Sequence, residues 1–237
     1  MELHHIAENK SELIFAQALT LTGANDYSGA TTVSSGELLV STAFAGGGGV
    51  VVSRGAALGV TNASIGSAGV GNLAIAAGAE LEFQSVASTT TPLVAASNVI
   101  VGGICAVKIT GGSNLVAGSS FPLVSYAGAI AGSFTNLQLQ MPYGWRGTLL
   151  NSGNQISLAN VAAVSVTPPP LSASISGQQL RVVWPADHIG WRLQAQTNSL
   201  SSEAWVNVAG YPAGLTNRIV FPINEGNGSV FYRLVYP

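Results

Sequence analysis

The chain has 237 residues, of which 8% are charged and 29 are glycine, and its formal net charge is -2. No run approaches the roughly 18 apolar residues of a membrane-spanning helix, and the eight Lys and Arg residues form no basic stripe for a phosphate backbone. We therefore expect neither membrane insertion nor a nucleic-acid partner. Val, Ala, Leu and Ile separated by Gly, Ser, Thr and Asn are typical of short strands and tight turns, which predicts an all-β protein.

We interpret residues 1–12 as a flexible leader. They lack the positive start and apolar segment of a secretory signal, so the chain is either intracellular or a piece of a longer exported protein. The pair His4-His5 has no third ligand nearby, and we assign it to the leader rather than to a metal site.

Residues 13–162 repeat a loose unit, in which a glycine turn precedes four to six residues of alternating apolar character. Such units begin at Gly36, Gly55, Gly71, Gly78 and Gly103. Their irregular spacing is typical of a parallel β-helix, a solenoid of short strands and variable loops, rather than of a propeller with blades of fixed length. We place the last coils and their cap at residues 116–137.

The four glycines from Gly46 to Gly49 interrupt this pattern. As a loop they gain nothing in packing, so we expect a flexible connection between coils. A phosphate-binding loop would need a following Lys-Ser/Thr or a helix, whereas residues 50–52 are Val-Val-Val and predict a strand.

Three consecutive motifs carry a resemblance to a known family: Tyr27-Ser28-Gly29, Thr31-Thr32-Val33 and Gly36-Glu37-Leu38-Leu39-Val40. They resemble the autotransporter-associated β-strand repeat of secreted bacterial proteins, closely over about 25 residues and more loosely beyond. The resemblance implies a β-helical passenger domain that is secreted or displayed on the cell surface. It favours a piece of an exported protein over an intracellular chain.

Residues 163–171 are predicted to form a linker. Pro168-Pro169-Pro170 cannot donate ladder hydrogen bonds and favours an extended polyproline conformation. Beyond these prolines the composition changes, because large aromatic residues become frequent, which predicts a second and independent core.

Residues 172–237 are predicted to form a small antiparallel β-sandwich, with strands at 172–176, 180–184, 191–197, 205–208, 217–222 and 229–235. The segments LRVVWPADHIGWRLQAQTNSL and NGSVFYRLVYP resemble a fibronectin type III-like end domain on long exported proteins of Verrucomicrobia-type bacteria. That resemblance implies a place in a protein rather than an activity.

Glu80 and Glu82 form the strongest candidate for catalysis, since two carboxylates two residues apart on a strand share one face, as in a glycosidase or lyase. We find no Asp, Arg or Lys in the same or adjacent unit to complete an acid–base set, and we predict a polar outward face instead.

Adjacent Asp187 and His188 are the candidates for a hydrolase triad. They should point away from one another on a polar turn, and no Gly-x-Ser-x-Gly elbow accompanies them.

Other candidate ligands are weaker still. Asn25-Asp26 supplies one carboxylate without a repeated acidic pattern, which argues against calcium. Cys105 is the only cysteine and lies in an apolar strand, so we expect a small buried hydrophobe. We therefore predict no cofactor, no metal and no catalytic residue.

Some aromatic residues of the last domain are candidates for a ligand-binding surface. Trp184 and Trp205 are expected in the core. Trp191, which follows a turn glycine, either packs in the core as well or forms a carbohydrate-binding platform, for which Tyr211 is the other candidate. The sequence thus predicts a non-catalytic structural or adhesive segment of a larger secreted bacterial protein, with cell-surface or extracellular polysaccharide as its partner. The alternative is a carbohydrate-active protein, either a polysaccharide-binding module or a β-helix glycosidase or lyase.

Overall fold

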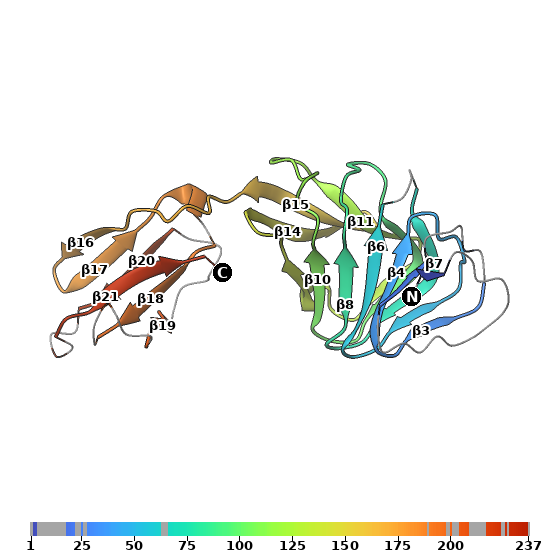
Figure 1. Cartoon of the computed structure of the whole chain (residues 1–237), viewed down its shortest axis with the longest axis horizontal. Coiled ribbons are helices and arrows are strands. Elements are labelled where there is room, and N and C mark those ends of the chain that lie inside the picture. Colours follow the sequence, from blue (N-terminus) through green and yellow to red (C-terminus); the bar gives the residue numbers. More distant parts are fainter. Residues whose placement is uncertain are drawn as a thin grey trace. The chain divides into compact units, whose positions relative to one another are not determined.

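The computed structural model describes residues 2–3, 18–21, 25, 28–62, 66–188, 190–197, 200, 204–208, 217–223, 226 and 228–236. Every regular element in these ranges is a β-strand except for two short 3-10 helices, which confirms the predicted all-β class (Figure 1). No helix in the described ranges is long and apolar enough to cross a membrane. The chain divides into two compact units, residues 1–162 and 163–237.

Two large sheets make up the first unit. Sheet A contains, in spatial order, β1 (Glu2–Leu3), β2 (Leu19–Leu21), β4 (Gly36–Ser41), β6 (Ala56–Thr61), β8 (Glu80–Phe83), β10 (Cys105–Ile109) and β13 (Leu137–Gln140). Sheet B contains β14 (Trp145–Ser152), β15 (Gln155–Ala163), β11 (Phe121–Tyr126), β9 (Val94–Val101), β7 (Ala68–Ile75), β5 (Val50–Val52) and β3 (Thr31–Val33), and β12 (Ile130–Ala131) also pairs with β9.

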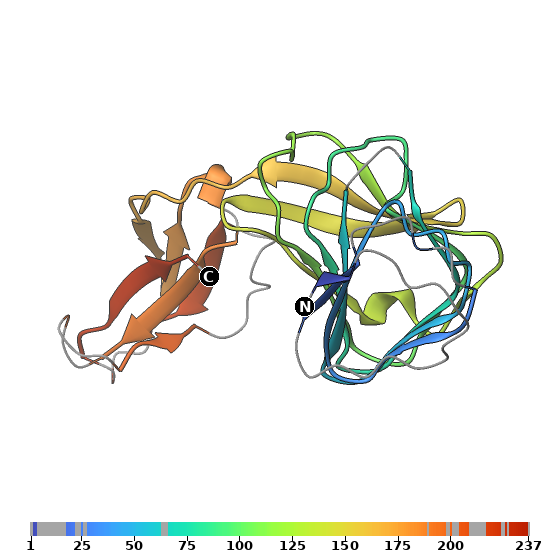
Figure 2. The same ribbon diagram turned by 45° about the vertical axis from the view of Figure 1, so that its right-hand side comes forward.

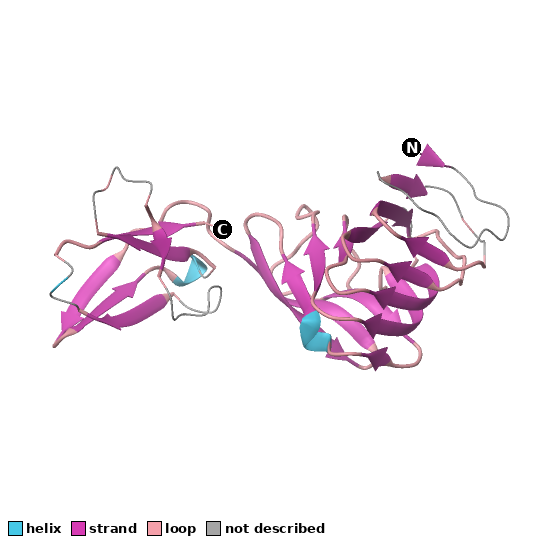
Figure 3. Cartoon of the chain, turned by 90° about the horizontal axis from the view of Figure 1, so that it is seen from below, coloured by secondary structure: helices cyan, strands magenta, loops and turns pink. Residues whose placement is uncertain are grey.

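From β2 to β11 consecutive strands alternate between the two sheets, so each circuit of the chain adds one strand to sheet A and one to sheet B. Figures 2 and 3 show these circuits following one another along the first unit. All strand pairs among β2 to β10 are parallel and in register. Residues one circuit apart therefore stand side by side, at the roughly 4.8 Å spacing of neighbouring strands.

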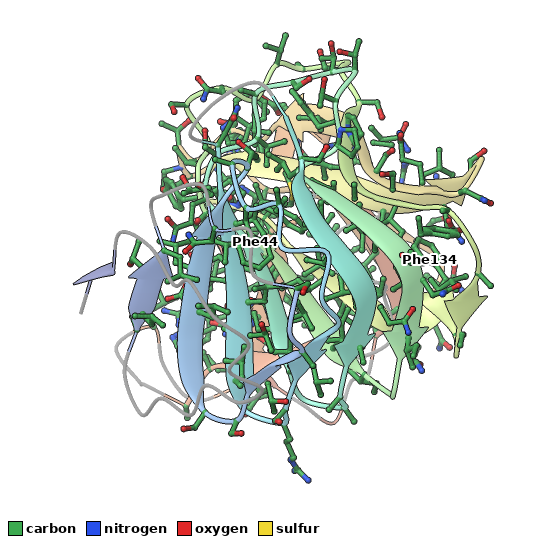
Figure 4. The ribbon with its side chains drawn as sticks, turned by 90° about the vertical axis from the view of Figure 1, so that its right-hand side faces the viewer. Phe44 and Phe134 are labelled. Carbon is green, nitrogen blue, oxygen red and sulfur yellow. The ribbon has the colours of Figure 1, made fainter. Side chains whose placement is uncertain are left out.

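Because the strands are in register, residues of the same kind lie next to one another on successive strands and form columns across the sheet. One inward column of sheet A is formed by Leu19, Leu38, Leu58, Leu81 and Val107, each at most 3% exposed. The inward side chains of both sheets meet in one apolar cluster, and side chains fill the space between the sheets in Figure 4. Phe44, labelled there, is buried in this cluster, and Phe134, in the 3-10 helix η1 (Phe134–Asn136), packs against it.

Gly48, within the glycine run 46–49, is closely packed, so the expectation that the run gains nothing in packing is wrong at this position, whereas Gly47 is exposed. A Cβ atom on Gly48 would overlap the carbonyl oxygen of Gly29 in the preceding circuit. On the other side, the backbone N–H of Gly71 in the next circuit donates to the Gly48 oxygen at 2.7 Å. Glycine is required at this position because three backbones approach one another more closely than side chains allow.

The last parallel strands, β11, β12 and β13, lie at residues 121–140, close to where we expected the last coils, but an antiparallel hairpin follows them where we expected the cap to lie within residues 116–137. Strand β15 pairs with β11 in antiparallel orientation, and β14 pairs with β15. The hairpin turns at Gly153 and Asn154, which both have φ of 58°, as a type I′ turn requires. A reversed strand does not continue the circuit pattern, and the sequence analysis missed it because β14 and β15 alternate much as the repeat units do.

Two three-stranded antiparallel sheets make up the described part of the second unit. Sheet C contains β16 (Ser172–Ser176), β17 (Gln179–Val183) and β20 (Arg218–Pro222), and sheet D contains β19 (Val206–Asn207), β18 (Arg192–Gln196) and β21 (Phe231–Val235). All six strands coincide with predicted ones to within one or two residues. Both sheets contribute to a second apolar cluster, formed by Val182, Trp184, Leu193 and Ile219.

We predict that alanine destabilises the first unit at position 48 but not at the neighbouring glycine, position 49. Gly48→Ala should lower the free energy of unfolding of the first unit by roughly 2 kcal/mol, because the added methyl group must displace backbone. Gly49→Ala, whose new Cβ would find its nearest atom at an ordinary 3.6 Å, should be neutral or stabilising by up to about 1 kcal/mol. Denaturant unfolding of both variants measures the difference in free energy of unfolding, and equal effects would contradict the close packing at Gly48.

Candidate functional site

Glu80 and Glu82 share the outer face of sheet A with a cation that the sequence analysis did not find. Lys108 lies opposite Glu82 on the neighbouring strand, and its Nζ is 3.0 Å from Glu82 Oε2 and 3.3 Å from Glu80 Oε1. The expectation that the two carboxylates lack a cation in an adjacent unit is therefore wrong. Lys108 is 26 residues from Glu82 in sequence but one strand away in space.

Glu82 is the most constrained of these carboxylates. Its Oε1 also accepts hydrogen bonds from Gln84 Nε2 at 3.2 Å and from Thr110 Oγ1 at 3.3 Å. Partial burial raises the pKa of Glu82, but the hydrogen bonds from Lys108, Gln84 and Thr110 outweigh it, so the pKa lies below its ordinary value. The same contact with Glu82 raises the pKa of Lys108.

Glu37 is a third carboxylate on this face, two circuits before Glu82. Gly59 lies on the strand between them, in the column of Glu82, and a Cβ atom on Gly59 would lie 2.5 Å from Glu37 Oε1. That oxygen is buried and has no hydrogen-bond partner in the described ranges. Burial, followed by repulsion from Glu82 and Glu80, raises the pKa of Glu37, although Lys108 opposes the shift.

This arrangement forms an ion-pair network rather than an acid–base pair. A general acid must carry a proton that it can give up, whereas Glu82 is held ionised by three donors. We find no group of three or more His, Cys, Asp or Glu side chains that could hold a metal ion among the residues described here. His4-His5 and Asp26, considered as ligands above, lie outside the described residues, and Asn25 is completely buried.

The signal for this network was present in the sequence. Aligning the units that begin at Gly36, Gly55, Gly78 and Gly103 by their buried residues places Glu37 and Glu80 in one outward column. Lys108 and Glu82 fall in the next column. The units were compared for their turns and apolar residues and not aligned column by column, so the cation was missed.

Asp187 and His188 lie in the 3-10 helix η2 (Ala186–His188) and face one another, which corrects the expectation that they point apart. Asp187 Oδ1 is 2.7 Å from His188 Nδ1. His188 Nε2 is 2.7 Å from the carbonyl oxygen of Thr167. A carbonyl oxygen only accepts, so Nε2 carries the proton and is not available as a general base.

His188 and Trp191 bind the segment that we predicted to be a linker. Besides the bond to Thr167, Trp191 Nε1 donates to the carbonyl oxygen of Ser165 at 2.8 Å, and the Ser165 N–H donates to the Asp187 carbonyl at 2.8 Å. Residues 165–167 are therefore fixed to the second unit by three hydrogen bonds. Whether the two units fold independently stays a prediction.

Trp191 is 3% exposed, so the exposed ring expected there is absent and this expectation is corrected. Its ring centroid lies 5.4 Å from that of His188 and 5.5 Å from that of Tyr236, and these neighbours cover it. Trp184 is 2% exposed and belongs to the apolar cluster, as predicted. Tyr211, the other candidate for a carbohydrate platform, lies outside the described residues.

Cys105 is buried in β10, as predicted for a small hydrophobe. Its Sγ lies 3.1 Å from the Gly103 oxygen and 3.2 Å from the Ala76 oxygen. Burial raises the pKa of the Cys105 thiol, which keeps it in the unreactive protonated form.

An apolar cavity of about 790 Å³ lies in the second unit. Its described lining includes Leu180, Val208, Phe221 and Tyr232, and none of the described lining residues carries a charge. Burial raises the pKa of Tyr232. Thr197 and Tyr232 supply the only hydroxyl groups in the described lining.

The outer face of sheet D carries a row of polar side chains across three strands, which the sequence analysis did not single out. Arg233 Nε donates to Gln194 Oε1 at 3.0 Å, and Gln194 Nε2 donates to Asn207 Oδ1 at 3.0 Å. The Arg233 guanidinium also lies over the ring of Trp205, 4.3 Å from its centroid. Trp205 is half-buried on this face and does not belong to the apolar cluster, which corrects the expectation that it lies in the core. Polar residues at every second position of a predicted strand indicate only an outward face, and the strand pairing decides which of them meet.

Among known protein families, the model of the passenger-associated-transport-repeat family matches residues 16–40, which span β2, β3 and β4. This repeat indicates a segment of an autotransporter passenger, a class of protein that is secreted or held at the cell surface. No curated protein and no solved structure matches the chain.

We predict opposite effects for two glutamates on the outer face of sheet A. At pH 7, Glu82→Gln should lower the free energy of unfolding by about 0.5 kcal/mol, because it removes a partly exposed ion pair. Glu37→Gln should raise the free energy of unfolding at the same pH, because it removes a carboxylate that folding makes harder to ionise. Denaturant unfolding near pH 7 and near pH 3 measures both.

The pH dependence of the free energy of unfolding follows from the two pKa shifts. Glu82, with a lowered pKa, stabilises the fold above its unfolded-state pKa and loses this contribution as the pH falls through its folded-state pKa. Glu37, with a raised pKa, lowers stability as the pH rises through the same region. Both differences from wild type should therefore shrink near pH 3, and equal signs for the two variants at pH 7 would contradict the described geometry.

We also predict that His188 protects the segment before the prolines. His188→Ala leaves the Thr167 carbonyl without its donor, so cleavage between residues 163 and 171 by a nonspecific protease should become roughly tenfold faster. Asp187→Asn keeps an acceptor beside His188 and serves as the control. Mass spectrometry of timed digests identifies the sites, and an unchanged rate in His188→Ala would show that the hydrogen bond does not hold the segment.

Proposed function

We propose that this chain is a non-catalytic structural and adhesive segment of a larger secreted bacterial protein. In this proposal the first unit is a β-solenoid of a passenger, and the second is a fibronectin type III-like β-sandwich that follows it. The single observation that carries the proposal is the match to the passenger-associated-transport-repeat at residues 16–40. The in-register strands that stack on these residues support its extension along the first unit.

The stacking also supports a structural role. Each circuit buries its apolar column against the circuits on either side, so an extended segment gains stability from every neighbouring pair of circuits. Polar side chains on the outer face of sheet A pair with one another, as Glu82 and Lys108 do. Such a segment can hold a binding module at a distance from a membrane without an activity of its own.

The absence of catalysis is part of the proposal. Glu82 accepts from three donors and His188 Nε2 donates to a carbonyl, so both strongest candidates are engaged in internal contacts. A carbohydrate-active protein is the second candidate, and one observation favours its binding form. The outer face of sheet D combines the indole of Trp205 with exposed polar groups, the usual components of a sugar-binding surface.

Surface display tests the passenger role. The chain is placed between a secretion signal and an outer-membrane translocator in a Gram-negative host, and antibody labelling of intact cells measures its export. We expect the wild type to be displayed and to resist added protease, because a stacked β-structure exposes few unfolded segments. Gly48→Ala should be cut faster and Gly49→Ala should match the wild type. Failure of the wild type to reach the surface would contradict the passenger role.

Turnover assays test the non-catalytic role separately. The purified chain should hydrolyse neither a panel of common polysaccharides nor small esters. Turnover that disappears in Glu80→Gln or His188→Ala, with an unchanged circular dichroism spectrum, would overturn the proposal and place the chemistry at the altered residue.

A further inference from the structure

The hydrogen bonds on the outer face of sheet D have a direction that Arg233 sets. A guanidinium can only donate, so Gln194 must turn its amide oxygen to Arg233 and its amide nitrogen to Asn207. Asn207 then accepts through its own oxygen. Both amide oxygens are engaged within this row, and the groups left over, Asn207 Nδ2 and the terminal nitrogens of Arg233, are all donors.

A second arginine adds charge to this face. Arg192 lies two residues before Gln194 on β18, and Leu193 between them is fully buried, so Arg192 and Gln194 point to the same outward side. Arg192 Nε is buried and has no hydrogen-bond partner within the described ranges. The only acidic side chain described in the second unit is Asp187, which is paired with His188. Among the side chains that the structure describes, the outer face of sheet D is therefore positive and rich in donors.

Arg233 is also held in place before any ligand arrives. Its Nε is fixed by Gln194 and its plane lies over the Trp205 ring, so two contacts restrict a side chain that is otherwise flexible. A guanidinium that is already ordered loses less conformational entropy when it binds. Its terminal nitrogens form the planar fork that matches the two oxygens of a carboxylate or a sulfate.

We propose that the outer face of sheet D binds an acidic polysaccharide, with an anionic group of one sugar on Arg233 and sugar hydroxyls on Asn207. The inference rests on the proposed adhesive function for the class of partner, and it adds the charge of that partner and the surface that takes it. An open, exposed sheet face suits an extended chain better than an enclosed small molecule. Two arginines are too few for the many phosphate contacts of a nucleic acid.

Binding of the purified full chain to three glycans tests the proposal. Alginate supplies carboxylates, dextran sulfate supplies sulfates, and dextran is the neutral control. We expect alginate, dextran sulfate or both to bind, dextran to bind at least tenfold more weakly, and added NaCl to weaken the binding. Comparison of the first two shows which anion the face prefers.

Variants locate the surface. Arg233→Ala should weaken binding of the preferred glycan about tenfold, as expected for one charged hydrogen-bonding group. Trp205→Ala should also weaken binding of the preferred glycan, because the Arg233 guanidinium loses the ring over which it lies. Arg181→Ala is the matched control, since Arg181 is an exposed arginine on β17 of sheet C, and it should stay within twofold of wild type. Melting temperatures of all three variants confirm folding.

Three results would overturn the inference: equal binding of dextran and alginate, equal losses in Arg181→Ala and Arg233→Ala, or no binding to any of the glycans. The last result is distinguishable from failure of the passenger role, because surface display is measured without a glycan. A chain that is displayed but binds no anionic glycan keeps the structural function and loses this surface.

Discussion

Parallel strands stacked in register, roughly 4.8 Å apart, are the constraint on which the first unit depends. At that spacing every side chain has its nearest neighbours one circuit away, so each column must be made of residues that tolerate one another. Inward columns therefore collect Leu and Val, as at Leu38, Leu58 and Leu81. Where the backbones themselves come closest, at Gly48, only glycine fits.

The same constraint governs the outward columns, where it brings charges together. Glu82 and Lys108 compensate one another across two strands, while Glu37 is next to Gly59 and receives no hydrogen bond in the described ranges. Two glutamates of the same face consequently have pKa shifts of opposite direction. The outer face of sheet A is thus an electrostatic unit that spans neighbouring columns, and its members contribute to stability in opposite ways.

In the second unit antiparallel pairing joins polar side chains into a row across three strands, and the fixed donor chemistry of Arg233 orients the amides of that row. Its tryptophans divide by burial: Trp184 and Trp191 are enclosed, whereas Trp205 supports an arginine at the surface. The first unit thus provides repeated stacking and the second provides a polar surface, a division that agrees with the proposed function.

Local pattern by itself determined the all-β class, the strands of the second unit and the repeat at residues 16–40, because turn glycines and two-residue alternation are properties of neighbouring residues. Only the tertiary structure decided that Lys108 meets Glu80 and Glu82, that Gly48 is packed, and that Trp191 is buried. Each of these facts depends on contacts between segments separated by a whole circuit or a whole sheet, and circuit lengths vary with the loops. Local pattern specifies which face a residue occupies, whereas the register between distant strands specifies which residue it meets there.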